Sequence, residues 1–123
     1  MNMRSLEQDR AAFAWAAVKA VKGKNFEKKY KSLVKKVPAL IMTNGLGNTL
    51  GYLRSKEGKE YGELIKNIDG WATEREFGGV DTLKWIIDGR TSSFQVMQAS
   101  REVLCMLNWL KRFATAELEG EAE

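Results

Sequence analysis

Apolar residues recur at helical spacing along most of this chain of 123 residues, and the longest such run extends from Ser92 to about Leu118. Ser92, with Gln95 three residues later, forms a capping-box pattern at the start of that run. The middle of the run is apolar on every side of the expected helix: Val103, Leu104, Cys105, Met106, Leu107, Trp109, Leu110 and Phe113. A helix without a polar face belongs at the centre of a bundle, so the sequence predicts a buried C-terminal helix.

Five shorter helices are expected before it, over residues 5–23, 25–37, 38–55, 59–75 and 81–89. Ser5 with Gln8 repeats the capping-box pattern, and Asn25 and Asp81 suit the starts of the second and fifth helices. Pro38 is expected to separate the second helix from the third, because proline lacks an amide donor and disfavours helix in the residue before it. Met42 is expected on the apolar stripe of the third helix.

The periodicity predicts an all-α fold, a compact single-domain bundle of about five to six helices around the buried C-terminal helix. The expected domain is residues 1–118, followed by an acidic tail, 119–123, which should fray. Within the third helix, Gly45, Gly47 and Gly51 are expected to let the helix lie close against a neighbour. The apolar positions of the short fifth helix include Val80 and Ile87.

Charge is distributed unevenly. The first 36 residues hold ten lysines or arginines against three acidic residues, whereas the last seven residues hold four glutamates. A concentrated basic region indicates an anionic partner, most often nucleic acid, although a solvated charged face is the alternative. On the second helix Lys24, Lys28, Lys31 and Lys35 are spaced to form one row, which Lys29 and Lys36 flank.

Trp15 lies off the apolar stripe of the first helix, beside Lys19 and Lys22. Such an aromatic residue among lysines could stack on a base or anchor a protein partner. It could equally pack on a neighbouring helix.

The residue types exclude several kinds of chemistry. With no histidine and one cysteine, the chain cannot build a standard zinc site or a Ser–His–Asp or Cys–His catalytic set. The glycine spacing in residues 44–51 fits neither a dinucleotide fingerprint nor a P-loop. We therefore expect no enzyme activity, no metal and no cofactor. No apolar run is long enough to span a membrane, and the lone Cys105 suits an inert buried thiol in a reducing cytoplasm.

Three segments carry a resemblance to a known family. The stretch from Lys29 to Pro38 runs directly into Asn44-Gly45-Leu46-Gly47, and Trp109-Leu110-Lys111-Arg112-Phe113-Ala114 closes the domain. Together they resemble the small subunit of the type III-B CRISPR RNA-guided effector, the Cmr complex. Phe94 departs from the tyrosine that opens the last helix in that family.

The resemblance implies a non-catalytic, RNA-binding structural subunit of RNA-guided antiviral defence. Its partners would be further copies of itself in a short filament, the backbone and large subunits of the Cmr effector, and guide and target RNA. The matched motif supplies part of the expected nucleic-acid-binding surface: Lys29, Lys31, Lys35 and Lys36. Spacing adds Lys24 and Lys28, and proximity adds Arg54 and Lys56.

Two other functions stay open on the residues alone. A helical protein-interaction adaptor could direct its basic surface to an acidic protein, with no nucleic-acid role. A DNA-binding regulator would need a recognition helix, and the sequence shows no clear helix-turn-helix pair. The isolated chain is expected to be a monomer.

Overall fold

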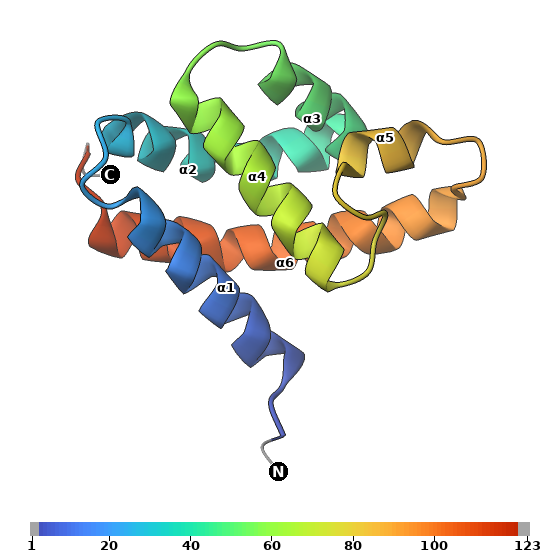
Figure 1. The fold of residues 1–123 in the computed structure, drawn as a ribbon, viewed down its shortest axis with the longest axis horizontal. Helices are drawn as coiled ribbons and strands as arrows, with labels where there is room; N and C mark the ends of the chain where they lie inside the picture. Colours follow the sequence, from blue (N-terminus) through green and yellow to red (C-terminus); the bar gives the residue numbers. More distant parts are fainter. Residues whose placement is uncertain (1–2, 121–123) are drawn as a thin grey trace.

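A computed structural model describes residues 3–120 of the chain, and within that range it contains helices and no strand. The helices are α1 (Leu6–Val21), α2 (Glu27–Asn44), α3 (Leu46–Arg54), α4 (Lys59–Glu74), α5 (Thr82–Ile87) and α6 (Ser93–Glu117). In Figure 1, α6 runs along the length of the molecule, α2, α3 and α5 lie on one side of it, and α1 and α4 cross it. The predicted all-α bundle is confirmed. None of the described helices is long and apolar enough to cross a membrane.

The core forms between α6 and the helices packed on it. Val103, Met106, Leu107 and Leu110 of α6 are fully buried, and Trp71 of α4 is the largest fully buried side chain. Burying a large apolar side chain contributes about 1.5–3 kcal/mol relative to leaving it exposed. The contacts of α6 with α1, α2 and α4 therefore hold the bundle together.

Local sequence signals set several helix starts. Capping boxes form at Ser5 and at Ser92, each paired with the predicted glutamine three residues later. The side chain of Asp81 caps α5. These three predictions are confirmed, and each cap satisfies backbone donors that the helix itself leaves unpaired.

The predicted break at Pro38 is wrong, because α2 continues through that residue to Asn44. Val34, Val37 and Ile41 lie on one continuous buried face across the proline. Packing of that face offsets the hydrogen bond that proline cannot donate. The chain turns instead at Gly45, whose φ of 89° is a conformation that favours glycine. Asn25 does not cap α2; Phe26 holds that position without a side-chain hydrogen bond.

The shifted break changes which residues face inward. Met42 belongs to α2, one position after buried Ile41, and is 77% exposed. Val80 and Ile87, which flank or end the short α5, are also exposed. Gly47 does allow a close approach, since a Cβ there would lie 3.3 Å from Ile86. This agrees with the predicted close approach at Gly47 only, because a Cβ at Gly45 or Gly51 would meet no neighbour within 4 Å.

Helix α6 is not buried on every side, contrary to the sequence prediction. Asn108, Lys111 and Arg112 are exposed, while Cys105 and Trp109 are only partly buried. The helices packed on α6 cover one side of it and leave another to solvent. Cys105 is therefore not the fully buried thiol that the sequence suggested.

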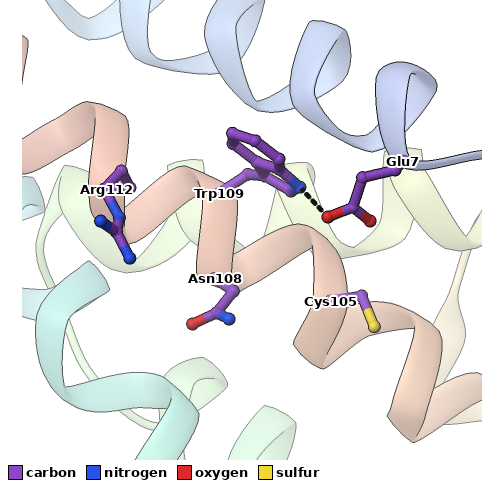
Figure 2. A pocket seen from close by; sticks show the side chains of 5 residues that line it. All are labelled: Glu7, Cys105, Asn108, Trp109 and Arg112. Atoms are coloured by element: carbon purple, nitrogen blue, oxygen red, sulfur yellow. Dashed lines mark hydrogen bonds between the residues drawn. The ribbon is translucent and has the colours of Figure 1, made fainter.

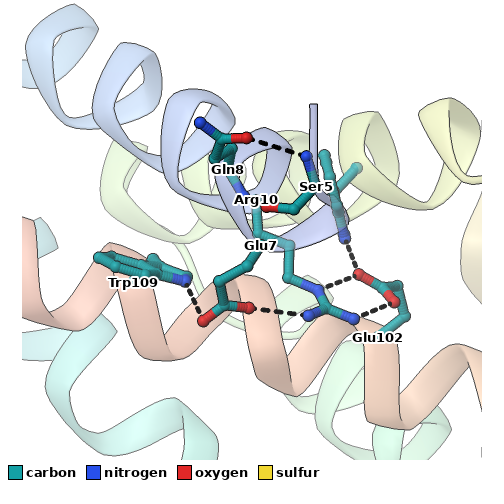
Figure 3. Close-up of polar contacts among 7 residues, drawn as sticks. Ser5, Glu7, Gln8, Arg10, Glu102 and Trp109 are labelled. Atoms are coloured by element: carbon teal, nitrogen blue, oxygen red, sulfur yellow. Dashed lines mark hydrogen bonds and ion pairs between the residues drawn. The ribbon is translucent and has the colours of Figure 1, made fainter. Parts of the chain in front are cut away.

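A polar network joins α1 to α6 at the edge of the core (Figure 3). The guanidinium of Arg10 donates two hydrogen bonds to the Glu102 carboxylate, at 2.7 and 2.8 Å, and a third to Glu7 at 2.8 Å. The indole N–H of Trp71 also donates to Glu102, at 3.1 Å. The bonds from Arg10 are the main reason that the pKa of Glu102 lies below its ordinary value of 4.5.

The network predicts a pH-dependent contribution to stability. Glu102→Gln should lower the free energy of unfolding at pH 7 by about 2 kcal/mol, because it leaves the buried face of Arg10 without its carboxylate. The pKa of Glu102 is depressed in the folded state, so this stabilisation is present above pH 4.5 and is lost as pH falls through the folded-state pKa. Urea unfolding of the unmodified protein and of the Glu102→Gln variant between pH 3 and 7 measures the difference in their free energies of unfolding.

Asp9→Asn is the matched control, because it breaks the exposed ion pair between Arg4 and Asp9. That pair should contribute well under about 1 kcal/mol. A Glu102→Gln effect no larger than that of Asp9→Asn would show that the network does not hold α1 on α6.

Candidate nucleic-acid interface

The predicted row of lysines does not form a single exposed row. Lys24 lies in the loop before α2, and Lys28 is exposed on its first turn. Lys31 is buried, and its ammonium donates a hydrogen bond to the carbonyl of Leu118 at 3.0 Å. Lys35 is partly buried. Lys31 therefore serves the fold and is removed from the surface that could meet an RNA.

Lys31 and Glu27, both on α2, hold the segment that follows α6, and this pair is hereafter called the clamp. The carboxylate of Glu27 accepts hydrogen bonds from the backbone N–H groups of Glu119, at 2.8 Å, and Gly23, at 3.0 Å. These bonds, that of Glu119 first, hold the pKa of Glu27 below its ordinary value. The first described residues of the acidic tail are thus fixed against α2. Glu121 and Glu123, also predicted to fray, lie outside the described residues.

A shallow hollow lies between α2 and α4 on another side of the lysine-rich helix. It has a volume of about 160 Å³ and is lined by Lys29, Ser32, Leu33, Lys36, Glu60 and Tyr61. Positions 29, 32 and 36 recur at one-turn spacing, which places these side chains on one face of α2. Both lysines are exposed.

Two tyrosines connect this hollow to the turn between α3 and α4. The rings of Tyr52 and Tyr61 meet edge to face, with centroids 6.5 Å apart. The Lys56 ammonium lies 5.2 Å from the centre of the Tyr52 ring. Lys29, Lys36, Tyr52, Lys56 and Tyr61 therefore form one connected region, hereafter the tyrosine–lysine surface. Of the described residues that line its hollow, Glu60 is the acidic one.

Arg54, a predicted site residue, is already engaged. Its guanidinium lies 2.6 Å from the Asp81 carboxylate, which also caps α5. The bond from Arg54 is the main reason that the pKa of Asp81 is lowered. Arg54 therefore ties α3 to α5 and is a weaker candidate for RNA than its neighbour Lys56.

Trp15 and its lysines form a different surface, between α1 and α6. Trp15 is 40% exposed and meets Phe113 edge to face, with centroids 5.2 Å apart. Lys19 lies 5.1 Å from the centre of the Trp15 ring, and Lys22 approaches Glu117 at 3.8 Å. Trp15 thus packs partly on a neighbouring helix, as one of the interpretations of its sequence position expected. The exposed part of its side chain stays open to a partner.

A further hollow, at which the sequence predicted no site, lies over α6 (Figure 2). It measures about 340 Å³ and is lined by Glu7, Cys105, Asn108, Trp109 and Arg112. Asn108 and Arg112 also line a neighbouring hollow of about 430 Å³ with Lys111, Thr115 and Ala116. The sequence does contain polar residues three and four positions apart in this helix. The apolar residues between them favoured the interpretation of a helix buried on all sides, so no surface hollow was predicted.

The described residues offer binding chemistry. Among them, no group of three or more Asp, Glu or Cys side chains is placed to hold a metal ion. The tyrosine–lysine surface instead supplies ammonium groups for anions and aromatic rings for apolar or stacking contacts.

Comparison with known proteins identifies the family. The family model described as "CRISPR-associated protein (Cas_Cmr5)" matches residues 6–117, which extends from the first residue of α1 to the last residue of α6. The chain belongs to the Cmr5 family. It is therefore the small subunit of a type III-B (Cmr) CRISPR effector, as the sequence resemblance indicated.

The fold agrees with that membership. The X-ray crystal structure of a CRISPR-associated Cmr5 family protein from Thermus thermophilus superposes with a TM-score of 0.80. The two sequences are 25% identical, and the match covers 95% of this chain and all of the Thermus chain. The six-helix arrangement is thus the Cmr5 fold.

The contacts of the clamp predict that replacing a structural lysine lowers stability more than replacing a surface lysine. Lys31→Met should lower the free energy of unfolding by about 1–3 kcal/mol, because the Leu118 carbonyl loses its buried donor. Lys28→Met removes the same charge from an exposed position one turn away and should change stability by less than about 0.5 kcal/mol. Urea unfolding followed by tryptophan fluorescence measures both. Equal effects would mean that Lys31 is not a structural residue.

Proposed function

We propose that this Cmr5-family subunit contacts RNA through the tyrosine–lysine surface while it stacks beside the guide-RNA filament of its effector. The observation that carries the proposal is the convergence of Lys29, Lys36 and Lys56 on one tyrosine pair. Those lysines come from two separate stretches of sequence. Their clustering leaves a surface suited to a phosphate chain.

The chemistry favours backbone contact. Ammonium groups neutralise phosphates without reading base sequence, so such contacts hold an RNA in place and carry little specificity. In an RNA-guided effector the sequence is read by base pairing between guide and target. A small subunit with a basic surface would then stabilise guide or target RNA, whichever strand passes over it.

The partners and the lack of catalysis that the family resemblance implies belong to the same proposal. We infer that copies of the chain stack on one another, that they meet the backbone and large subunits, and that the chain catalyses no reaction. The absence of histidine from the whole sequence supports the last inference. Monomeric state in isolation and a cytoplasmic location are predictions as well.

A salt titration of RNA binding tests the proposal. If Lys29, Lys36 and Lys56 each neutralise one phosphate, log affinity for a single-stranded RNA should fall with log salt at a slope of about −2, at about −0.7 per contact. Lys29→Glu combined with Lys36→Glu should reduce that slope to about −0.7. Fluorescence anisotropy of a labelled single-stranded RNA measures the slope.

The control carries the same change of charge at other exposed lysines. Lys66 and Lys84 are exposed on α4 and α5 and do not line the hollow of the tyrosine–lysine surface. Lys66→Glu combined with Lys84→Glu should leave the slope near its original value. Equal flattening by the two double variants would contradict a localised RNA site, since general charge would then explain binding.

A further inference from the structure

The outer face of α6 carries a seam that the proposed RNA contact does not use. The seam begins with Phe94 and Met97 and continues through Arg101, Leu104, Asn108 and Lys111, in alternating steps of three and four residues. This alternation places side chains along one side of a helix and is the spacing with which a helix packs against a second helix. It extends over nearly five turns of a 25-residue helix.

The seam faces away from the core. Ala99, Val103, Met106 and Leu110 form the buried side of α6, whereas Phe94 is 60% exposed and Met97 is 47% exposed. Arg101, Asn108 and Lys111 are exposed, and Leu104 is partly buried. The seam is therefore open to a partner over most of its length.

The seam is apolar at one end and cationic at the other. Phe94 and Met97 occupy its start, and Lys111 lies near its end beside Arg112. In residues 3–120, the side chains of Arg101, Lys111 and Arg112 form no hydrogen bond or ion pair. Among the described residues, no carboxylate lines the hollow over Lys111 and Arg112, and Glu7 lines the neighbouring hollow that Arg112 shares. Glu102, next to the seam in sequence, turns inward to Arg10.

We propose that this seam docks an amphipathic helix of a different protein. That helix would place apolar residues against Phe94, Met97 and Leu104, and carboxylates against Arg101, Lys111 and Arg112. Desolvated aromatic and arginine side chains are the groups that contribute most at protein interfaces. The cations would fix the direction of the docked helix, because only one orientation pairs them with its acidic end.

Charge argues against packing of this seam on the same seam of a second copy. Two α6 helices packed in parallel would bring Lys111 and Arg112 of both copies together. Packed antiparallel, they would bury each cationic end against Phe94 and Met97 of the other copy. Both arrangements leave charge without a counter-ion, which is costly at an interface. RNA fits less well, because the first turns of the seam offer apolar side chains where phosphates would need cations.

Assembly of the effector with variant subunits tests the seam. Lys111→Glu combined with Arg112→Glu should weaken retention of this subunit in the co-expressed complex by about tenfold, measured against salt after capture through another subunit. Its single-stranded RNA affinity should retain the original salt slope. Lys66→Glu with Lys84→Glu is the matched control: it carries the same change of charge at exposed lysines outside both surfaces and should stay in the complex.

Equal loss of the two double variants would overturn the docking proposal, and so would full retention of the α6 variant. A failure of the RNA titration alone would leave the docking proposal standing, because the two tests use different residues.

Photo-crosslinking then identifies the occupant. A benzoyl-phenylalanine placed at Met97 in the assembled complex should crosslink to a helix of another protein whose sequence alternates apolar and acidic positions. A crosslink to RNA, a crosslink to a second copy of this chain, or the lack of any crosslink would each contradict the proposed occupant.

Discussion

Burial of one side of α6 is the constraint on which the rest of the structure depends. The side that carries Val103, Met106 and Leu110 is covered by α1, α2 and α4. Glu102 lies on the same helix, where Arg10 and Trp71 satisfy its carboxylate, so the position of α1 is fixed by charge as well as by packing. Because one side of α6 is used in this way, the other side remains available for a partner.

The basic residues divide into those that hold the fold and those that are available for binding. Lys31 binds the Leu118 carbonyl, Arg10 binds Glu102, and Arg54 binds Asp81. Lys29, Lys36 and Lys56 gather around two tyrosines, while Lys111 and Arg112 lie on α6. The excess of positive charge in the sequence is therefore distributed over two distinct surfaces. Family membership alone does not distinguish these two surfaces.

Periodicity and capping patterns predicted the helices well, because both are local: Ser5, Asp81 and Ser92 cap as their neighbours in sequence suggest. The prediction failed where tertiary packing decided the outcome, as at Pro38, where a continuous buried face keeps the helix intact. The location of Lys31 could not be predicted, since it depends on where residue 118 returns to α2. Likewise, nothing near Lys29 in sequence indicates that Tyr61 lies beside it.

Lysine reactivity in the assembled effector tests the division of basic residues most directly. Acetylation would be measured by mass spectrometry for the free subunit, for the subunit assembled with its protein partners alone, and for the assembly with guide and target RNA. The account predicts that Lys29, Lys36 and Lys56 lose reactivity when RNA is present, that Lys111 loses it on assembly with protein alone, and that buried Lys31 is unreactive throughout. Protection of Lys111 by RNA, with Lys29, Lys36 and Lys56 unchanged, would contradict it.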